Sequence, residues 1–151
     1  MRKKTKNNLI IAAVAVGVVA LLAFLFFSRP SDDSPLIAAR GLHWHPTLTV
    51  IINGEQVPIP ANVGLGIVHN PIHTHDDDGV VHLEFTGPVR ESSITLGKFF
   101  EVWSRTFNSE CIFEFCNGSE GTMTMMVNGV ENNEFQHHSM RDGEMIEILY
   151  E

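Results

Sequence analysis

The segment TLGKFFEVWSRTFN, residues 95–108, decides the expected fold because it carries the clearest helical pattern in the chain. Large apolar residues recur in it at intervals of three and four, the periodicity of one helix face. Thr95 is a suitable N-cap and Asn108 a suitable end. The apolar stripe consists of Leu96, Phe99, Phe100, Trp103 and Phe107. Its bulk predicts a helix that packs against a core rather than one that binds a cofactor.

Strand patterns lie on both sides of this helix. Residues 47–60 alternate around Asn53-Gly54, a pair that favours the type I′ turn of a β-hairpin. One helix combined with a mixed sheet predicts an α+β domain. Further strands are expected at residues 80–85, 111–115, 122–127 and 145–150.

The C-terminal part resembles a β-grasp, the ubiquitin-like fold. The resemblance rests on Val127-Asn128-Gly129 and on the apolar-x-Asp-Gly-Glu pattern of residues 140–148, which leads into the last strand. It implies a β-grasp-like mixed sheet with one packed helix. It does not imply a known activity, because sulfur carriers of this fold end in Gly-Gly and ferredoxin clusters need four cysteines, whereas this chain has two.

The N-terminal stretch Leu9–Phe27 contains no charged side chain, and about 20 apolar residues suffice to cross a bilayer as a helix. Basic residues precede it, and such residues stay on the cytoplasmic side. We therefore expect a single transmembrane helix that anchors the protein in the cell membrane, with the N-terminus cytoplasmic. A cleaved signal peptide is the alternative, although its apolar core is usually only about 7–15 residues long.

The expected organisation has three parts. Residues 1–28 form a cytoplasmic basic tip and transmembrane anchor, residues 29–41 a linker, and residues 42–151 an extracytoplasmic α+β domain of ordinary size. All 18 acidic residues follow the apolar stretch, with only six of the ten basic ones, so this part has a formal net charge of −12. Nucleic acid is therefore not an expected partner, since phosphate binding requires a basic face.

Histidines are concentrated in the segment PIHTHDDDGVVHLE, residues 71–84. Alternate residues of a strand point to the same face, so His73 and His75 share one. A hairpin turn of two or four residues then brings His82 and Glu84 to that face as well. Three imidazoles beside a carboxylate form a donor set that suits a transition metal ion such as zinc or copper.

A second pair, His43 and His45, completes this site if its strand neighbours the hairpin. Glu84 and Asp76 are candidate ligands, partners that orient the imidazoles, or a general base. The expected cofactor is one transition metal ion, with copper or zinc preferred. A solvated polar hairpin without a metal is the alternative interpretation.

Other residues give weaker signals. Cys111 and Cys116 are the only cysteines, and a disulfide, two free thiols or metal ligation all remain open. Asn117 begins an Asn-Gly-Ser glycosylation sequon. His137 and His138 are adjacent, so on a strand they point apart, and we expect both at the surface.

The whole domain also resembles a group of uncharacterised membrane-anchored prokaryotic proteins. They share His-x-His, His-Thr-His-Asp, Gly-Val-Val-His-Leu-Glu and Leu-Gly-x-Phe-Phe-x-x-Trp motifs. In this chain the motifs lie at residues 43–45, 73–76, 79–84 and 96–103. The resemblance implies a grouping and a membrane anchor, but no reaction.

Three functions are compatible with these patterns. The preferred one is a membrane-tethered extracytoplasmic domain that binds and hands on copper or zinc through clustered histidines. The second is a metal-dependent enzyme with a three-histidine centre. The third is an accessory subunit of a membrane complex, with an unknown membrane-protein partner and structural histidines.

Overall fold

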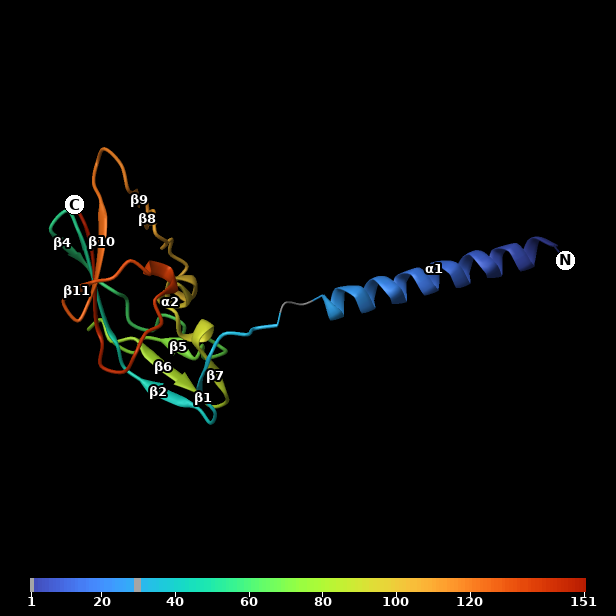
Figure 1. Cartoon of the computed structure of the whole chain (residues 1–151), viewed down its shortest axis with the longest axis horizontal. Coiled ribbons are helices and arrows are strands. Elements are labelled where there is room, and N and C mark those ends of the chain that lie inside the picture. The colour runs from blue at the N-terminus through green and yellow to red at the C-terminus, as the bar shows by residue number, and fades with distance from the viewer. Residues whose placement is uncertain (1, 29–30) are drawn as a thin grey trace. The chain divides into compact units, whose positions relative to one another are not determined.

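The computed structural model describes the backbone of residues 2–28 and 31–151, with side chains from position 12 onward in those ranges. The chain divides into two compact units, Met1–Asp33 and Ser34–Glu151. The helix α1 (Arg2–Phe27) belongs to the first unit, and all the strands belong to the second (Figure 1).

The expected transmembrane helix is contradicted. Across the described part of the chain, no helix is both long enough and apolar enough to span a membrane. The predictions of a transmembrane anchor and of a single-pass membrane topology are therefore contradicted.

The second unit contains a five-stranded sheet in the order β11-β10-β12-β3-β4. Its members are β3 (Thr47–Ile52), β4 (Glu55–Val57), β10 (Met123–Val127), β11 (Val130–Glu131) and β12 (Met145–Tyr150). The central strands β3 and β12 pair in parallel, and each also pairs with an antiparallel neighbour. The domain is thus α+β as expected, while the β-grasp resemblance stays a prediction.

The helix α2 (Leu96–Trp103) buries its aromatic face in the core. It is shorter than the sequence predicted, because Ser104 takes a left-handed conformation (φ 58°) and ends the helix. Phe107 nevertheless stays in the core, where its ring stacks on that of Phe100 with 4.4 Å between centroids. The predicted apolar stripe is therefore correct as a packing surface, although its last member lies beyond the helix.

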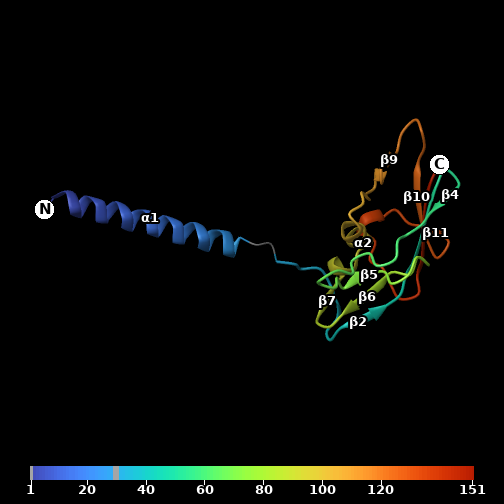
Figure 2. The same cartoon turned by 180° about the vertical axis from the view of Figure 1, so that it is seen from behind.

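A three-stranded sheet has the order β2-β6-β5. It consists of β2 (Leu42–Trp44), β5 (Ile72–His73) and β6 (His82–Phe85). Figures 1 and 2 both show it at the end of the domain away from the C-terminus. The remaining short elements are β1 (Leu36–Ala38), β7 (Val89–Arg90), β8 (Cys111–Ile112), β9 (Phe115–Cys116) and the 3₁₀ helices Glu91–Ile94 (η1) and Phe135–His137 (η2).

A tight junction joins the two sheets just before β6. Leu48 N–H donates to the Gly79 carbonyl (2.8 Å), and Val81 N–H donates to the Pro46 carbonyl (2.9 Å). Gly79 has φ +83°, and a Cβ there would lie 2.6 Å from the Leu48 carbonyl oxygen. Only glycine fits this close approach, which fixes the start of β6 against the start of β3.

Candidate metal centre

The hairpin β5-β6 sets the geometry of the histidines. His73 lies directly opposite His82, the register expected for a four-residue turn, although the connection between the two strands is eight residues long, 74–81. Between the two histidines of His-Thr-His, the buried Thr74 points the other way. Its hydroxyl donates to the Pro60 carbonyl (2.7 Å) and accepts from Val63 N–H (3.0 Å). The threonine therefore holds this strand to the preceding loop while the imidazoles face away from it.

Two groups of side chains bring candidate ligand atoms within 4.8 Å of one another. We call them the inner histidine set, which is His73, His75, His82 and Glu84, and the outer histidine set, which is His43, His45 and His82. Both sets could hold a metal ion, and they share His82.

The spacing of two nitrogens in the inner histidine set suits a small metal ion. Nε2 of His73 and Nε2 of His75 are 3.2 Å apart. In a tetrahedral site with metal–nitrogen bonds of about 2.0–2.1 Å, two ligand nitrogens are about 3.3 Å apart. The two imidazoles therefore already have the separation that a shared ion requires.

A hydrogen bond fixes which nitrogen of His73 is free to bind. Nδ1 of His73 lies 3.0 Å from the carbonyl oxygen of Asn70. A carbonyl only accepts, so Nδ1 carries the proton and Nε2 keeps its lone pair in the neutral ring. Burial lowers the pKa of His73, although the hydrogen bond to Asn70 opposes the shift, and this favours the neutral form. Metal-binding histidines commonly have this kind of backbone partner.

His82 has an unusual environment for a polar ring. Its Nδ1 is buried and has no hydrogen-bond partner, and the Glu84 carboxylate oxygen lies 3.7 Å away. Burial lowers the pKa of His82, and the neighbouring imidazoles of His75, His45 and His73 lower it further. A buried polar atom without a partner costs free energy, and an ion bound at this ring would supply one.

Besides His82, the outer histidine set contains His43 from β2 and His45, which directly follows β2; we call these two the outer pair. His43 lies opposite Glu84, and its Nε2 is 3.1 Å from the Glu84 Oε1. The His45 ring stands 4.8 Å from that of His82. The backbone N–H of His45 donates to Asp142 Oδ1 (2.9 Å), and its Nδ1 lies 3.8 Å from the same oxygen. Asp142 thus positions His45 although 97 residues separate them in sequence.

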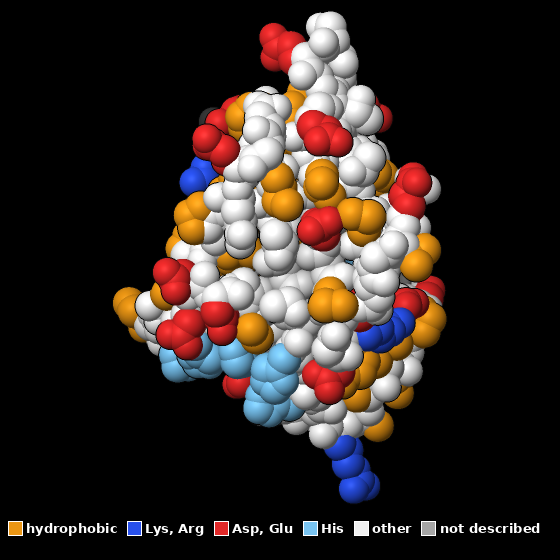
Figure 3. Space-filling model, turned by 90° about the vertical axis from the view of Figure 1, so that its left-hand side faces the viewer, with side chains coloured by type: hydrophobic (Ala, Val, Ile, Leu, Met, Phe, Trp, Pro, Cys, Tyr) orange, Lys and Arg blue, Asp and Glu red, His pale blue; other side chains and the backbone are white. Residues whose placement is uncertain are grey.

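The structure brings together six of the seven residues that the sequence suggested for the metal site. The exception is Asp76, which is exposed and belongs to neither set. Sequence reasoning missed Asn70 and Asp142, because a backbone carbonyl and a distant turn give no local signal. Figure 3 shows histidine side chains gathered into one surface patch, with acidic side chains along its border.

The cysteines lie in a separate hairpin. Cys111 and Cys116 pair directly across β8 and β9 and form a disulfide. The next residue, Asn117, is exposed, and its Oδ1 accepts from Met123 N–H (2.7 Å). Its glycosylation stays a prediction.

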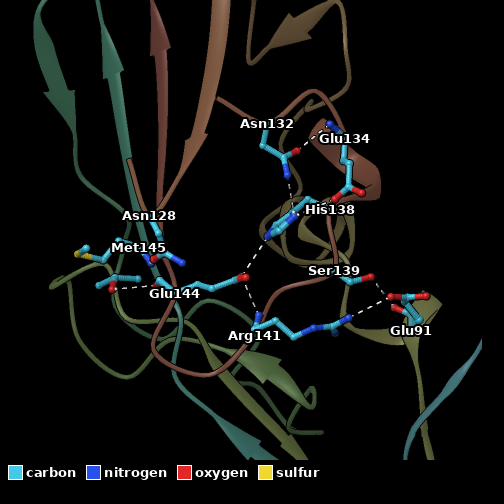
Figure 4. Close-up of polar contacts among 10 residues, drawn as sticks. Glu91, Asn128, Asn132, Glu134, His138, Ser139, Arg141, Glu144 and Met145 are labelled. Atoms are coloured by element: carbon cyan, nitrogen blue, oxygen red, sulfur yellow. Dashed lines mark hydrogen bonds and ion pairs between the residues drawn. The ribbon is translucent and has the colours of Figure 1, made fainter. Parts of the chain in front are cut away.

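The expectation of a surface position is wrong for His138, which is 6% exposed, whereas His137 is exposed. His138 follows the 3₁₀ helix η2 rather than a strand. Its Nδ1 lies 3.0 Å from Glu134, and its Nε2 lies 3.0 Å from Glu144 (Figure 4). The hydrogen bond to His138 lowers the pKa of the Glu134 carboxyl. Both imidazole nitrogens are therefore already partnered.

Two of the larger cavities in the described part of the chain lie outside the histidine sets. One of about 430 Å³ borders His138, Glu134 and Glu144. The other, of about 780 Å³, lies between β4 and the β8-β9 hairpin.

No protein-family model matches this chain, and no curated protein or solved structure is significantly similar to it.

Proposed function

We propose that this protein binds a single transition metal ion, copper or zinc, at the inner histidine set. The observation that carries the proposal is the convergence of three imidazoles and one carboxylate, with all ligand atoms within 4.8 Å of one another. This donor set suits zinc and copper(II) and is poorly suited to magnesium or calcium, which prefer oxygen ligands.

The protonation state of the imidazole rings supports the proposal. A histidine binds a metal only as the neutral ring, and burial lowers the pKa values of His73 and His82. The carbonyl of Asn70 orients His73 with Nε2 toward His75. Little rearrangement is needed for binding, so little of the binding free energy is lost in ordering the ligands.

The acidic composition supports a cation as the ligand. The chain has a formal net charge of −8, and Glu84 is the only carboxylate in either histidine set. One carboxylate with neutral imidazoles reduces the charge of a bound divalent ion from +2 to +1. The negative potential of the acidic chain also attracts a cation from a longer distance.

The test is metal binding by the full-length chain, purified without a polyhistidine tag and stripped with a chelator. Zn²⁺ and Cu²⁺ are titrated separately, with bound metal measured by elemental analysis. We expect one ion per chain. At 100 times the dissociation constant, the melting temperature should rise by roughly 5–10 °C.

Mg²⁺ is the matched control, since it prefers oxygen ligands and should leave the melting temperature unchanged. A chain that stays metal-free after both zinc and copper additions, with no change in melting temperature, contradicts the proposal.

A further inference from the structure

The inner and outer histidine sets share one residue, His82. His82 lies on the central strand β6 of the three-stranded sheet. On one side, β5 presents His73 directly opposite it. On the other side, β2 leads into His45, whose ring is 4.8 Å from that of His82. His82 therefore stands between two His-x-His pairs, each within reach of it.

The two sets differ in their access to solvent. His73 of the inner histidine set is 4% exposed. In the outer histidine set, the side chains of His43 and His45 are 64% and 43% exposed. His75 and Glu84 of the inner histidine set are exposed as well, so solvent reaches both sets, and the buried His73 is what distinguishes the inner histidine set.

Charge favours one ion at a time. Glu84 Oε1 lies 3.1 Å from His43 Nε2 and 3.7 Å from His82 Nδ1, so this carboxylate stands at the border between the sets. Neutral imidazoles add no negative charge. Two divalent ions at neighbouring positions would be balanced by a single carboxylate, and their mutual repulsion disfavours simultaneous binding.

We propose that the outer histidine set is a second metal position, through which one ion enters and leaves the inner histidine set while His82 stays bound to it. This inference rests on the proposed function. In the transfer, the bonds from the metal to the outer pair break and bonds to His73 and His75 form. The oxidation state of the metal does not change, and the ring proton that His75 Nε2 donates to His73 Nε2 moves to Nδ1 of His75 by exchange with solvent, which leaves both Nε2 lone pairs for the metal.

Exchange with one ligand retained avoids an intermediate in which the ion has lost every protein nitrogen. Glu84 remains beside His82 throughout and keeps a negative charge close to the moving ion. The path therefore lowers the barrier to loading without weakening the final site. The outer pair should affect rates more than it affects affinity.

The test compares the wild-type full-length chain with the double variants His43→Ala/His45→Ala and His43→Gln/His45→Gln. Both histidines are exposed, so the substitutions leave the core intact. Zn²⁺ affinity is measured by competition with a chromophoric chelator, and loading and release are followed by stopped flow. We expect affinity within about threefold of wild type, while both rates fall roughly tenfold, equivalent to about 1.4 kcal/mol of activation free energy.

His137→Ala is the matched control, because it removes an exposed histidine that belongs to neither set. Unchanged rates in both double variants overturn the inference, since the outer pair is then not on the path. A loss of Zn²⁺ affinity in the double variants as large as that caused by removing His73 and His75 also overturns the inference. It would show that all five histidines bind one ion. A wild-type chain that binds no zinc or copper contradicts the proposed function itself.

Discussion

The inner histidine set and His138 place histidines in opposite situations within one small domain. His138 is buried with a carboxylate 3.0 Å from each ring nitrogen, so its bonding capacity is used within the protein. In the inner histidine set, two Nε2 atoms face each other at 3.2 Å, and Nδ1 of His82 is buried without a hydrogen-bond partner. The comparison shows that a histidine is a candidate ligand when its ring nitrogens face other imidazoles or lack a partner, and a structural element when carboxylates occupy both of them.

The largest effect should come from removing the inner pair. In the variant His73→Gln/His75→Gln, affinity for Zn²⁺ should fall by more than about 100-fold, since even partners that only orient ligands are worth about 10–100-fold. Chelator competition measures the affinity, and circular dichroism checks the fold. An affinity within a few fold of wild type contradicts the assignment of these two residues as ligands.

The converse experiment is His138→Ala, which should lower the free energy of unfolding by about 2–3 kcal/mol, because two part-buried charge-assisted hydrogen bonds are lost. Zn²⁺ affinity should stay within about twofold of wild type, since this ring lies in neither histidine set. Chemical denaturation and zinc titration are carried out on the same samples. If His138→Ala lost zinc affinity without losing stability, His138 would be a ligand and not a structural residue.

A smaller effect is expected for Glu84→Gln, which keeps the shape of the side chain but removes its charge. Zn²⁺ affinity should fall about tenfold, whether Glu84 binds the ion or only orients a ligand. Isothermal titration at several salt concentrations measures the change. Asp76→Asn is the control, because it removes an exposed carboxylate that is outside both sets. Equal losses of Zn²⁺ affinity in the two variants would show that the overall charge, and not the position of Glu84, causes the effect.

The smallest effect is the pH dependence of the metal-free chain. Below the ordinary histidine pKa of 6.5, the unfolded state binds more protons than the folded state, in which the pKa values of His73 and His82 are lowered. Stability should therefore decline as pH falls below 6.5. Glu134 acts in a separate, lower range, since its contribution is present above its ordinary pKa of 4.5 and is lost as pH falls below that value.

Denaturation at half-unit pH steps resolves the two ranges. His82→Gln should flatten the upper range, and His138→Ala should flatten the lower one. If either variant changed the stability in both pH ranges equally, the inner histidine set and the His138 site would not titrate independently.

The sequence predicted local pairings well, because turn length and side-chain alternation determine them. His73 lies opposite His82 in the register expected for a four-residue turn, although eight residues connect β5 to β6, and the hairpin around Asn53-Gly54 forms between β3 and β4. Wherever two strands adjoin in sequence, the register follows from a few residues.

The errors arose where distant segments decide the outcome. Whether His43 and His45 join the cluster depends on the pairing of β2 with β6, which the sequence left conditional. The burial of His138 depends on Glu144, which approaches it in the folded chain. The end of α2 at Ser104 depends on one left-handed residue with no glycine to mark it.

The parallel pairing of β12 with β3 has a consequence for when the centre can mature during synthesis. β12 is the last strand in sequence order, yet it lies between β10 and β3 in the middle of the larger sheet. The start of β3 supports β6, and Asp142, just before β12, holds His45. A growing chain that has emerged only as far as Glu84 carries every histidine of both sets but lacks the strand that fixes their support. The proposed metal site is therefore expected to form only in the completed polypeptide, and partly synthesised chains should compete poorly for the ion.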